Sequence, residues 1–234
     1  MEKRKKSRRR RLIIWLLIDL VVAALVISLL LHKPAGYRPV MPPAGADPNE
    51  RRVPRYLTHD LGNTLYNGAQ RQQPFEMIVL GNRLNEAIAQ AGWLQESAGI
   101  KLSAPAIAFT PERVVLMGTA DLEGAGFVIT VEIDPQITQD GRLNLRVEKV
   151  KIGVMNVTWL ARKMGKKMYR ERVAAGGVDP DDWRTKIAAS LLNDEPFEPV
   201  LPLEDKWIRL KGLDIIEGRL TAQFVPVPAG PRGQ

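Results

Sequence analysis

A run of twenty residues from Leu12 to Leu31 carries only one charged side chain, and it constrains the chain more than any other feature. At 1.5 Å per residue, a helix of this length spans about 30 Å, the hydrocarbon thickness of a typical bilayer. A cleaved signal peptide would have a shorter apolar region, about 7–15 residues, and a small-x-small cleavage site. A His-Lys-Pro sequence follows the run instead. The sequence therefore predicts an uncleaved membrane-spanning signal anchor over residues 12–31.

The basic residues predict the orientation of this helix. Residues 1–11 hold eight Lys and Arg side chains and one Glu, whereas residues 32–234 hold 26 basic and 24 acidic side chains. Only Lys33 and Arg38 follow the apolar run closely. By the positive-inside rule, the basic tail is cytoplasmic and residues 32–234 are exported from the plasma (inner) membrane.

The same distribution of charge narrows the choice of partners. The formal net charge of +8 would suit nucleic acid, but most of it resides in the tail beside the membrane. We expect the tail to set the topology and to touch anionic lipid. Binding of nucleic acid or ribosomes by the tail is the alternative. The lipid bilayer is the expected partner, and no nucleic acid is expected for the folded domain.

Asp19 is the charged residue within the apolar run. A carboxylate deep in a spanning helix costs about 2.5–3.5 kcal/mol on insertion scales. One interpretation is that Asp19 contacts a polar residue of another membrane helix. The other is a protonated Asp that a strongly apolar helix tolerates.

Composition divides the rest of the chain into segments. Six Pro residues in residues 32–54 predict a semi-extended linker. Leu57, Leu61 and Leu65, at a spacing of four, predict a short amphipathic helix. The expected order is a connector over residues 55–73, an exported domain over 74–225 and a disordered tail over 226–234.

Alternation of apolar and polar residues predicts an antiparallel meander. Its expected strands lie at residues 105–109, 113–122, 127–133 and 142–152. Residues 75–80 are expected to form a separate strand before the first helix, and residues 207–210 and 213–225 a closing hairpin. Asp140-Gly141 is a strong hairpin turn, and Glu217-Gly218 is expected to turn the last hairpin. A shift of the alternation predicts a bulge near Glu148 and Lys149.

Three helices are expected in the exported domain. With Asn82 as N-cap, the first runs from Arg83 to about Glu96. The second covers Val157–Ala174 and carries Leu160, Met164 and Met168 on one stripe. The third follows Asp179-Pro180, an N-cap with Pro at the first turn, and ends near Asn193. The predicted fold class is α+β: an N-terminal transmembrane helix, then a curled antiparallel sheet of about six or seven strands packed with one long helix plus two further helices.

The sequence offers few groups for catalysis. It contains no Cys and two His, and it lacks the nucleophile-elbow, Walker, zincin and dinucleotide-binding motifs. Asp179, Asp181 and Asp182 could bind a cation, but three acids at a helix start usually act as caps. Asn156-Val157-Thr158 matches a glycosylation sequon, a triplet that is common by chance. We expect no enzymatic activity, no cofactor and no metal.

Two sets of residues are candidate sites. The expected helix at residues 157–174 could attract anionic headgroups or an acidic partner, and a solvated basic face is the alternative. Its candidate contact residues, together with Asp19, are Arg162, Lys163, Lys166, Lys167 and Arg170. Several strands are apolar on both faces, which suits a lipid ligand or two-sided packing by helices. The candidate lipid-lining residues are Leu84, Ile88, Leu116, Phe127, Ile129 and Val131.

The order of these features resembles a known family. A basic anchor and a Pro-rich linker precede a strand that runs into a helix over Phe75–Ile88. The sequence DGRLNL follows at residues 140–145, and VKIG at residues 150–153 leads into the basic helix. Over residues 74–172 this order is similar to YpmS-like single-pass bacterial membrane proteins and, more distantly, to one half of the tubular lipid-binding fold. The resemblance implies a long helix in a curled sheet and lipid binding, and it supplies no functional residue.

These observations predict a non-enzymatic, membrane-anchored protein of the cell envelope. Its expected role is accessory or scaffolding, with binding of lipid or of another envelope protein by the exported domain. The alternative is a docking subunit of a membrane complex that binds no ligand.

Overall fold

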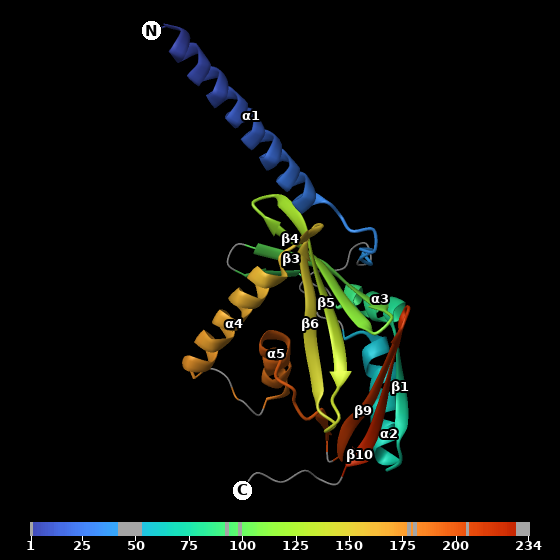
Figure 1. Ribbon diagram of the computed structural model, residues 1–234. Helices are drawn as coiled ribbons and strands as arrows, with labels where there is room; N and C mark the ends of the chain where they lie inside the picture. Colours follow the sequence, from blue (N-terminus) through green and yellow to red (C-terminus); the bar gives the residue numbers. More distant parts are fainter. Residues whose placement is uncertain are drawn as a thin grey trace.

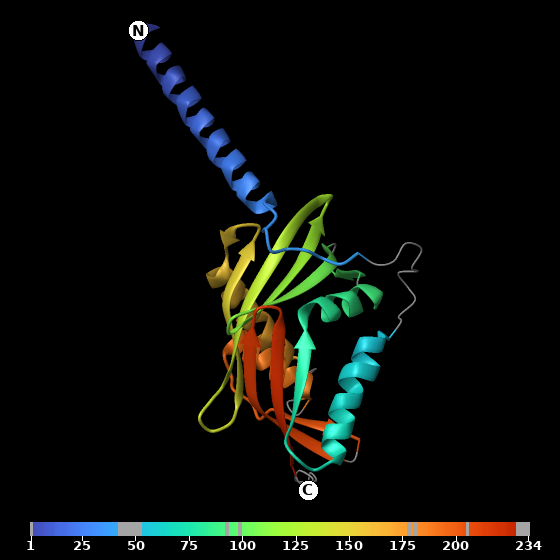
Figure 2. The same cartoon turned by 90° about the vertical axis from the view of Figure 1, so that its right-hand side faces the viewer.

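The computed structural model describes residues 2–41, 53–91, 94–97, 100–176, 179, 182–204 and 206–227. Helix α1 (Glu2–Leu31) projects from one end of the folded domain (Figure 1 and Figure 2). Its segment Ile13–Leu31 has a mean hydropathy of 2.9 and is not buried against the rest of the chain. A helix of this length and composition can cross a membrane, as the sequence predicts.

Two short helices precede the first strand. The π-helix η1 (Tyr56–Leu61) runs directly into α2 (Gly62–Gln70), so the predicted short helix is confirmed. Helix α2 buries its last turn against the strands. The ring of Phe75 occupies the space that a Cβ at Gly68 would fill, and the missing side chain therefore lets α2 lie close to the sheet.

A four-stranded sheet, sheet A, joins the beginning of the domain to its end. Its antiparallel order is β1-β10-β9-β8, with β1 (Phe75–Leu80), β8 (Val200–Leu203), β9 (Lys206–Ile216) and β10 (Arg219–Val227). The predicted turn at Glu217-Gly218 is confirmed. Pro226 and Val227, expected in a disordered tail, instead pair with β9. Residues 228–234 lie outside the described residues.

The main hydrophobic core lies under sheet A. Phe224 is 5 % exposed, and its ring stacks on that of Phe75 with the centroids 5.5 Å apart. The other buried members of this cluster come from α2, β6, β9 and β10: Ala69, Leu143, Ile208, Leu210 and Ala222. The core therefore ties the start of the domain to its final hairpin.

A six-stranded antiparallel sheet, sheet B, has its strands in chain order. They are β2 (Leu94–Ser97), β3 (Ile100–Thr110), β4 (Arg113–Leu122), β5 (Ala125–Ile137), β6 (Leu143–Ile152) and β7 (Met155–Asn156). The predicted meander is thereby confirmed. The predicted bulge is also present, because Glu132 pairs with Lys149 while Ile133 pairs with Val147, which leaves Glu148 as the extra residue.

Turns of the two sheets meet at a shared junction. The Gly218 N–H donates to the Phe109 carbonyl (2.9 Å), and the Glu112 N–H donates to the Ile215 carbonyl (3.0 Å). Val79, Phe109 and Ile215 form a second buried cluster there. The fold class is α+β, as predicted, with the strands divided between two sheets. The division arises because β1 pairs with the C-terminal hairpin, which leaves the meander to form a sheet of its own.

The first helix of the domain is shorter than predicted. Helix α3 spans Gly81–Gln90. Its N-cap is Leu80, which makes no side-chain cap hydrogen bond, rather than the predicted Asn82. Residues 94–97, expected in the same helix, form β2 and pair with Ile100–Ser103. The apolar stripe of the helix continued formally to Leu94, but hairpin pairing with the long strand β3 takes precedence over that periodicity.

Two helices connect the sheets. Helix α4 (Thr158–Ala174) has the predicted extent, and α5 spans Trp183–Asn193. The N-cap of α5 is Asp182, whose carboxylate accepts from the Arg184 N–H, rather than Asp179. Pro180 and Asp181 lie outside the described residues.

Candidate functional site

The end of α1 is attached to sheet B by the β6–β7 turn. The Val154 N–H donates to the carbonyl of Leu29 (3.1 Å), and the Gly153 N–H donates to the Val128 carbonyl of β5 (2.8 Å). Gly153 has φ +59°, and a Cβ there would overlap with the carbonyl oxygens of Leu29 and Leu30. A residue without a side chain is therefore required where the turn meets the helix.

Tyr37 fixes the first part of the linker to the same sheet. Its hydroxyl donates to the Ala104 carbonyl and shares a second hydrogen bond with Thr119 Oγ1, both at 2.7 Å. The pairing of β3 with β4 is interrupted between Ser103 and Ala106, so the Ala104 carbonyl needs a partner outside the ladder. The chain that leaves α1 is thus held against the domain at residue 37.

Strand β6 pairs with β7 over only two residues, Lys151 and Ile152. Side chains of α4 and α5 satisfy backbone groups along the rest of its outer edge, as strand edges require. The Leu145 N–H donates to Ser190 Oγ (2.7 Å), Arg162 Nη2 donates to the Val147 carbonyl (2.6 Å), and the Val150 N–H donates to Thr158 Oγ1 (2.8 Å).

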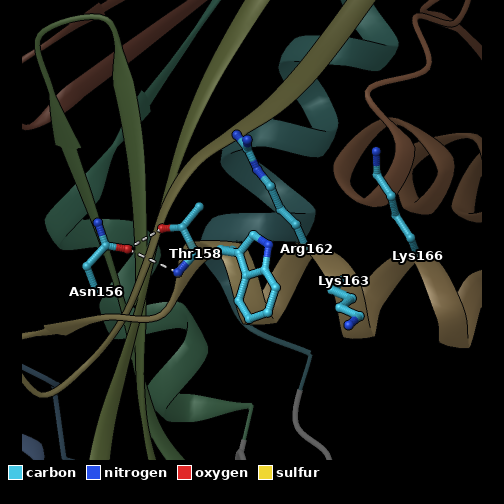
Figure 3. Close-up of a pocket in the computed structure, with 6 residues that line it drawn as sticks. Asn156, Thr158, Arg162, Lys163 and Lys166 are labelled. Carbon is cyan, nitrogen blue, oxygen red and sulfur yellow. Dashed lines mark hydrogen bonds between the residues drawn. The ribbon is translucent and has the colours of Figure 1, made fainter.

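These contacts fix which face of α4 points inward. Arg162 reaches β6, and Gly165 lies against the side chain of Leu192 in α5, where a Cβ would come within 2.8 Å. In Figure 3, Arg162 and Lys163 project from α4 in different directions. The rotation of α4 about its axis is therefore set by polar contacts to the strand edge and by close packing on α5.

The apolar stripe of α4 consequently faces outward. Trp159 is 74 % exposed, Met164 is 55 % exposed, and Leu160 and Met168 are exposed as well. No residue of α4 is buried. The stripe predicted from the sequence is correct, but its orientation differs from that of an amphipathic helix packed on a core by its apolar side. We call Trp159, Leu160, Met164 and Met168 the outward stripe.

Arg162 differs from the other candidate basic residues of α4, because it donates to the Val147 carbonyl. Lys163, Lys166, Lys167 and Arg170 border the outward stripe. Lys163 and the half-buried Lys166 also line a groove with Asn156 and Thr158 (Figure 3). Lys163 Nζ lies 5.3 Å from the ring centroid of Trp159, and Lys167 lies 3.8 Å from Glu171.

Positive charge within residues 32–234 is concentrated on this helix. Helix α4 carries six basic residues and one acidic residue, a net charge of +5. The rest of residues 32–234 carries 20 basic and 23 acidic residues, a net charge of −3. The outward stripe is therefore flanked by cations on a domain that is otherwise acidic.

The candidate lipid-lining residues lie in two places. Leu116 pairs directly with Val131, and Phe127 and Ile129 share their face of sheet B. Leu84 packs against the buried cluster at the junction of the sheets, and Ile88 lies on the same helix, α3. All six are half-buried. Sheet B has edges at β2 and β7, so it does not close into a tube over the described residues.

Other polar side chains have structural partners or stand apart. Asp121 accepts from the Gly124 N–H in a turn, Asp134 accepts from Gln136, and Asn156 Oδ1 accepts from the Thr158 N–H at the start of α4. Asp19 is exposed on the apolar span of α1. Within the described residues, no group of three or more His, Cys, Asp or Glu side chains could hold a metal ion.

Glu132 is the centre of a charged cluster on sheet B. Burial of its side chain, which is 13 % exposed, raises its pKa. The hydrogen bond from Lys151 Nζ (2.6 Å) and the charges of Lys151, Lys149 and Arg113 outweigh burial, so the pKa lies below the ordinary value of 4.5. These contacts join β4, β5 and β6 and indicate a structural role.

Acid is expected to weaken this cluster. A carboxylate whose pKa is depressed on folding stabilises the folded state above its ordinary pKa, and this stabilisation is lost as the pH falls through the folded-state value. We expect the urea concentration at the unfolding midpoint of the full chain in detergent to decrease when the pH is lowered below about 4.5. Glu132→Gln should destabilise the protein at neutral pH by on the order of 1 kcal/mol and reduce the acid dependence. An equal loss in Glu86→Gln, which removes an exposed carboxylate 3.9 Å from Arg83, would contradict this assignment.

Sequence reasoning missed three residues of this region. Gly153 and Val154 were part of a strand-to-helix connection, and no local pattern indicates that they meet α1. Trp159 could have been found, because it lies in the first turn of α4, four positions before Lys163 and on the same side of the helix.

No family model, curated protein or solved structure matches this chain, so the resemblance to YpmS-like proteins stays a prediction.

Proposed function

We propose that this protein is a non-enzymatic, single-pass protein of the cell envelope whose exported domain serves as an accessory or scaffolding module seated on the membrane. Its N-terminus is cytoplasmic, and residues 32–234 are exported. The observation that carries the proposal is the hydrogen bond from the Val154 N–H to the Leu29 carbonyl.

The position of Leu29 supports a domain that rests on the bilayer. Leu29 belongs to the apolar segment Ile13–Leu31, so the turn that binds it lies at the boundary of the hydrocarbon. A Pro-rich linker extends by up to about 3.1 Å per residue and would otherwise allow the domain to move far from the membrane. Attachment through Val154 and Tyr37 instead gives the domain one orientation relative to α1. A fixed orientation suits a module that presents a surface to the membrane or to a membrane-bound neighbour.

The eight basic residues before the span support the orientation. Cysteine labelling tests it directly, because the chain has no Cys. We would express the full chain as Ser7→Cys or as Lys211→Cys, the latter at an exposed position of β9, in a bacterial host. A membrane-impermeant maleimide is expected to label Lys211→Cys in intact spheroplasts and Ser7→Cys only after lysis. The reverse pattern, or release of the chain from the membrane by alkaline carbonate, would overturn the proposal.

A further inference from the structure

We propose that α4 is an interfacial helix that lies on the anionic phospholipid surface of the membrane spanned by α1. The outward stripe enters the boundary between headgroups and acyl chains, and Lys163, Lys167 and Arg170 pair with lipid phosphates. This inference rests on the proposed function, because it requires α1 to span the bilayer beside the domain.

The first step is the fixed rotation of α4. Arg162 and Thr158 form hydrogen bonds with backbone groups of β6, and the side chain of Leu192 in α5 packs against Gly165. Turning the outward stripe toward the core would therefore leave the Val147 carbonyl and the Val150 N–H without these partners, which is costly for buried backbone groups. The stripe needs a partner outside the domain.

The second step is the chemistry of the exposed side chains. Lys163 Nζ lies over the ring of Trp159. A tryptophan ring is suited to the level of the lipid headgroups, and a long lysine side chain can reach a lipid phosphate. Leu160, Met164 and Met168 follow at a spacing of four and are exposed. An apolar stripe with a tryptophan and flanking cations is typical of helices that lie in the plane of an interface.

The third step is the position of α4 relative to the anchor. Thr158, which begins α4, is the fourth residue after Val154, whose N–H donates to α1. Even fully extended, that stretch covers at most about 14 Å. The headgroup layer on each side of the hydrocarbon is roughly 5–8 Å thick. Figure 1 shows α4 running crosswise to α1, as expected for a helix that lies along a surface crossed by α1.

The fourth step is charge, which selects anionic lipid. Helix α4 carries +5, whereas the rest of the exported part carries −3. An anionic surface therefore attracts α4 and repels the remainder of the domain. Within the described residues, Lys163 and Arg170 have no carboxylate partner that would neutralise them.

Environment-sensitive labels in reconstituted protein test this inference. Two variants of the full chain, Met164→Cys and Ile78→Cys, would each be labelled with a nitrobenzoxadiazole fluorophore. Each would be reconstituted in nanodiscs at one copy per disc. Ile78 is the matched control, since it is exposed to 50 % on sheet A, against 55 % for Met164. The discs contain phosphatidylcholine alone or with about 30 % phosphatidylglycerol. We expect severalfold brighter, blue-shifted emission from position 164 in the anionic discs, and no change at position 78.

A charge reversal identifies the contribution of the cations. Lys163→Glu with Lys167→Glu, in the Met164→Cys protein, is expected to return the emission to that of the Ile78 control, while circular dichroism stays unchanged. A Met164 label that matches the control in both lipids would overturn the inference. So would equal brightness in neutral and anionic discs, or brightening only when copies are concentrated in detergent, which would assign the stripe to a second copy.

The outcome is separable from that of the proposed function. If α1 does not span the membrane, the chain fails to enter the discs at all and the maleimide pattern is lost. If only the inference on α4 is incorrect, the chain enters the discs and keeps its topology, while the label at position 164 remains in water.

Discussion

Gly153→Ala is expected to detach the folded domain from the end of α1. A Cβ at this position overlaps with the carbonyl oxygens of Leu29 and Leu30, which are backbone atoms of a helix and cannot move aside without breaking it. The substitution also places a side chain at φ +59°, which costs about 1–2 kcal/mol. We expect the hydrogen bond from Val154 to Leu29 to be lost while both sheets stay folded.

Disulfide trapping measures this attachment in a chain that has no Cys of its own. The full-length protein with Leu29→Cys and Val154→Cys would be oxidised at low concentration in detergent, and the linked peptides would be quantified by mass spectrometry. With Gly153 present, we expect rapid formation of the intramolecular disulfide. With Gly153→Ala, we expect it to form roughly tenfold more slowly, the factor that corresponds to a penalty of about 1.4 kcal/mol.

Gly141→Ala separates the steric overlap from backbone strain. Gly141 also has a positive φ of +79°, but no atom lies within 4 Å of its Cβ position. Trapping between positions 29 and 154 should therefore proceed normally in Gly141→Ala. Unchanged trapping in Gly153→Ala would show that the β6–β7 turn does not rest on α1.

Phe224→Ala is expected to cause the largest loss of stability. The side chain is 5 % exposed and stacks on Phe75, which in turn fills the space beside Gly68 of α2. Replacing a buried Phe with Ala typically costs about 3–5 kcal/mol, because a cavity remains. For a chain of this size, this corresponds to a decrease in Tm of roughly 6–20 °C. Thermal unfolding of the full chain in detergent, followed by circular dichroism, measures it.

Two variants limit the interpretation of that loss. Ile78→Ala removes an apolar side chain that is 50 % exposed on the outer face of sheet A, and it should change stability by less than about 0.5 kcal/mol. Phe224→Leu keeps most of the apolar volume and should cost less than Phe224→Ala. A Phe224→Ala protein as stable as the Ile78→Ala protein would contradict the assigned core.

The attachment of α1 and the exposed stripe of α4 arise from one stretch of chain. Gly153 and Val154 contact α1, and α4 begins four residues after Val154. The same short segment therefore determines both where the domain lies relative to α1 and which helix is presented beside α1. This arrangement supports the proposal of a module that works on the membrane surface.

Much of the local structure could be predicted because it depends on short-range chemistry. The turns at Asp140-Gly141 and Glu217-Gly218 follow from residues that favour tight turns. The bulge at Glu148 follows from a shift of alternation within one strand. The extent of α4 was predicted from its own sequence, as were the basic residues that it carries.

Other features depend on distant partners and were mispredicted or missed. Residues 94–97 leave the helical pattern because they pair with the start of β3. The N-cap of α5 is Asp182 rather than the predicted Asp179, although both are chemically suitable caps. Helical periodicity identified the apolar stripe of α4 but could not give its direction, since this depends on the edge of β6 and on Leu192.

The sequence by itself determined the apolar span, the concentration of basic charge at residues 1–11 and on α4, the strand-and-turn pattern and the α+β class. Each of these depends on composition or on neighbours within a few residues. Only the tertiary structure decided that β1 joins the C-terminal hairpin, that Gly153 and Val154 rest on α1 and that the stripe of α4 faces outward. These features depend on which backbone groups of distant segments satisfy one another, and such pairings leave no mark in the local periodicity of a single chain.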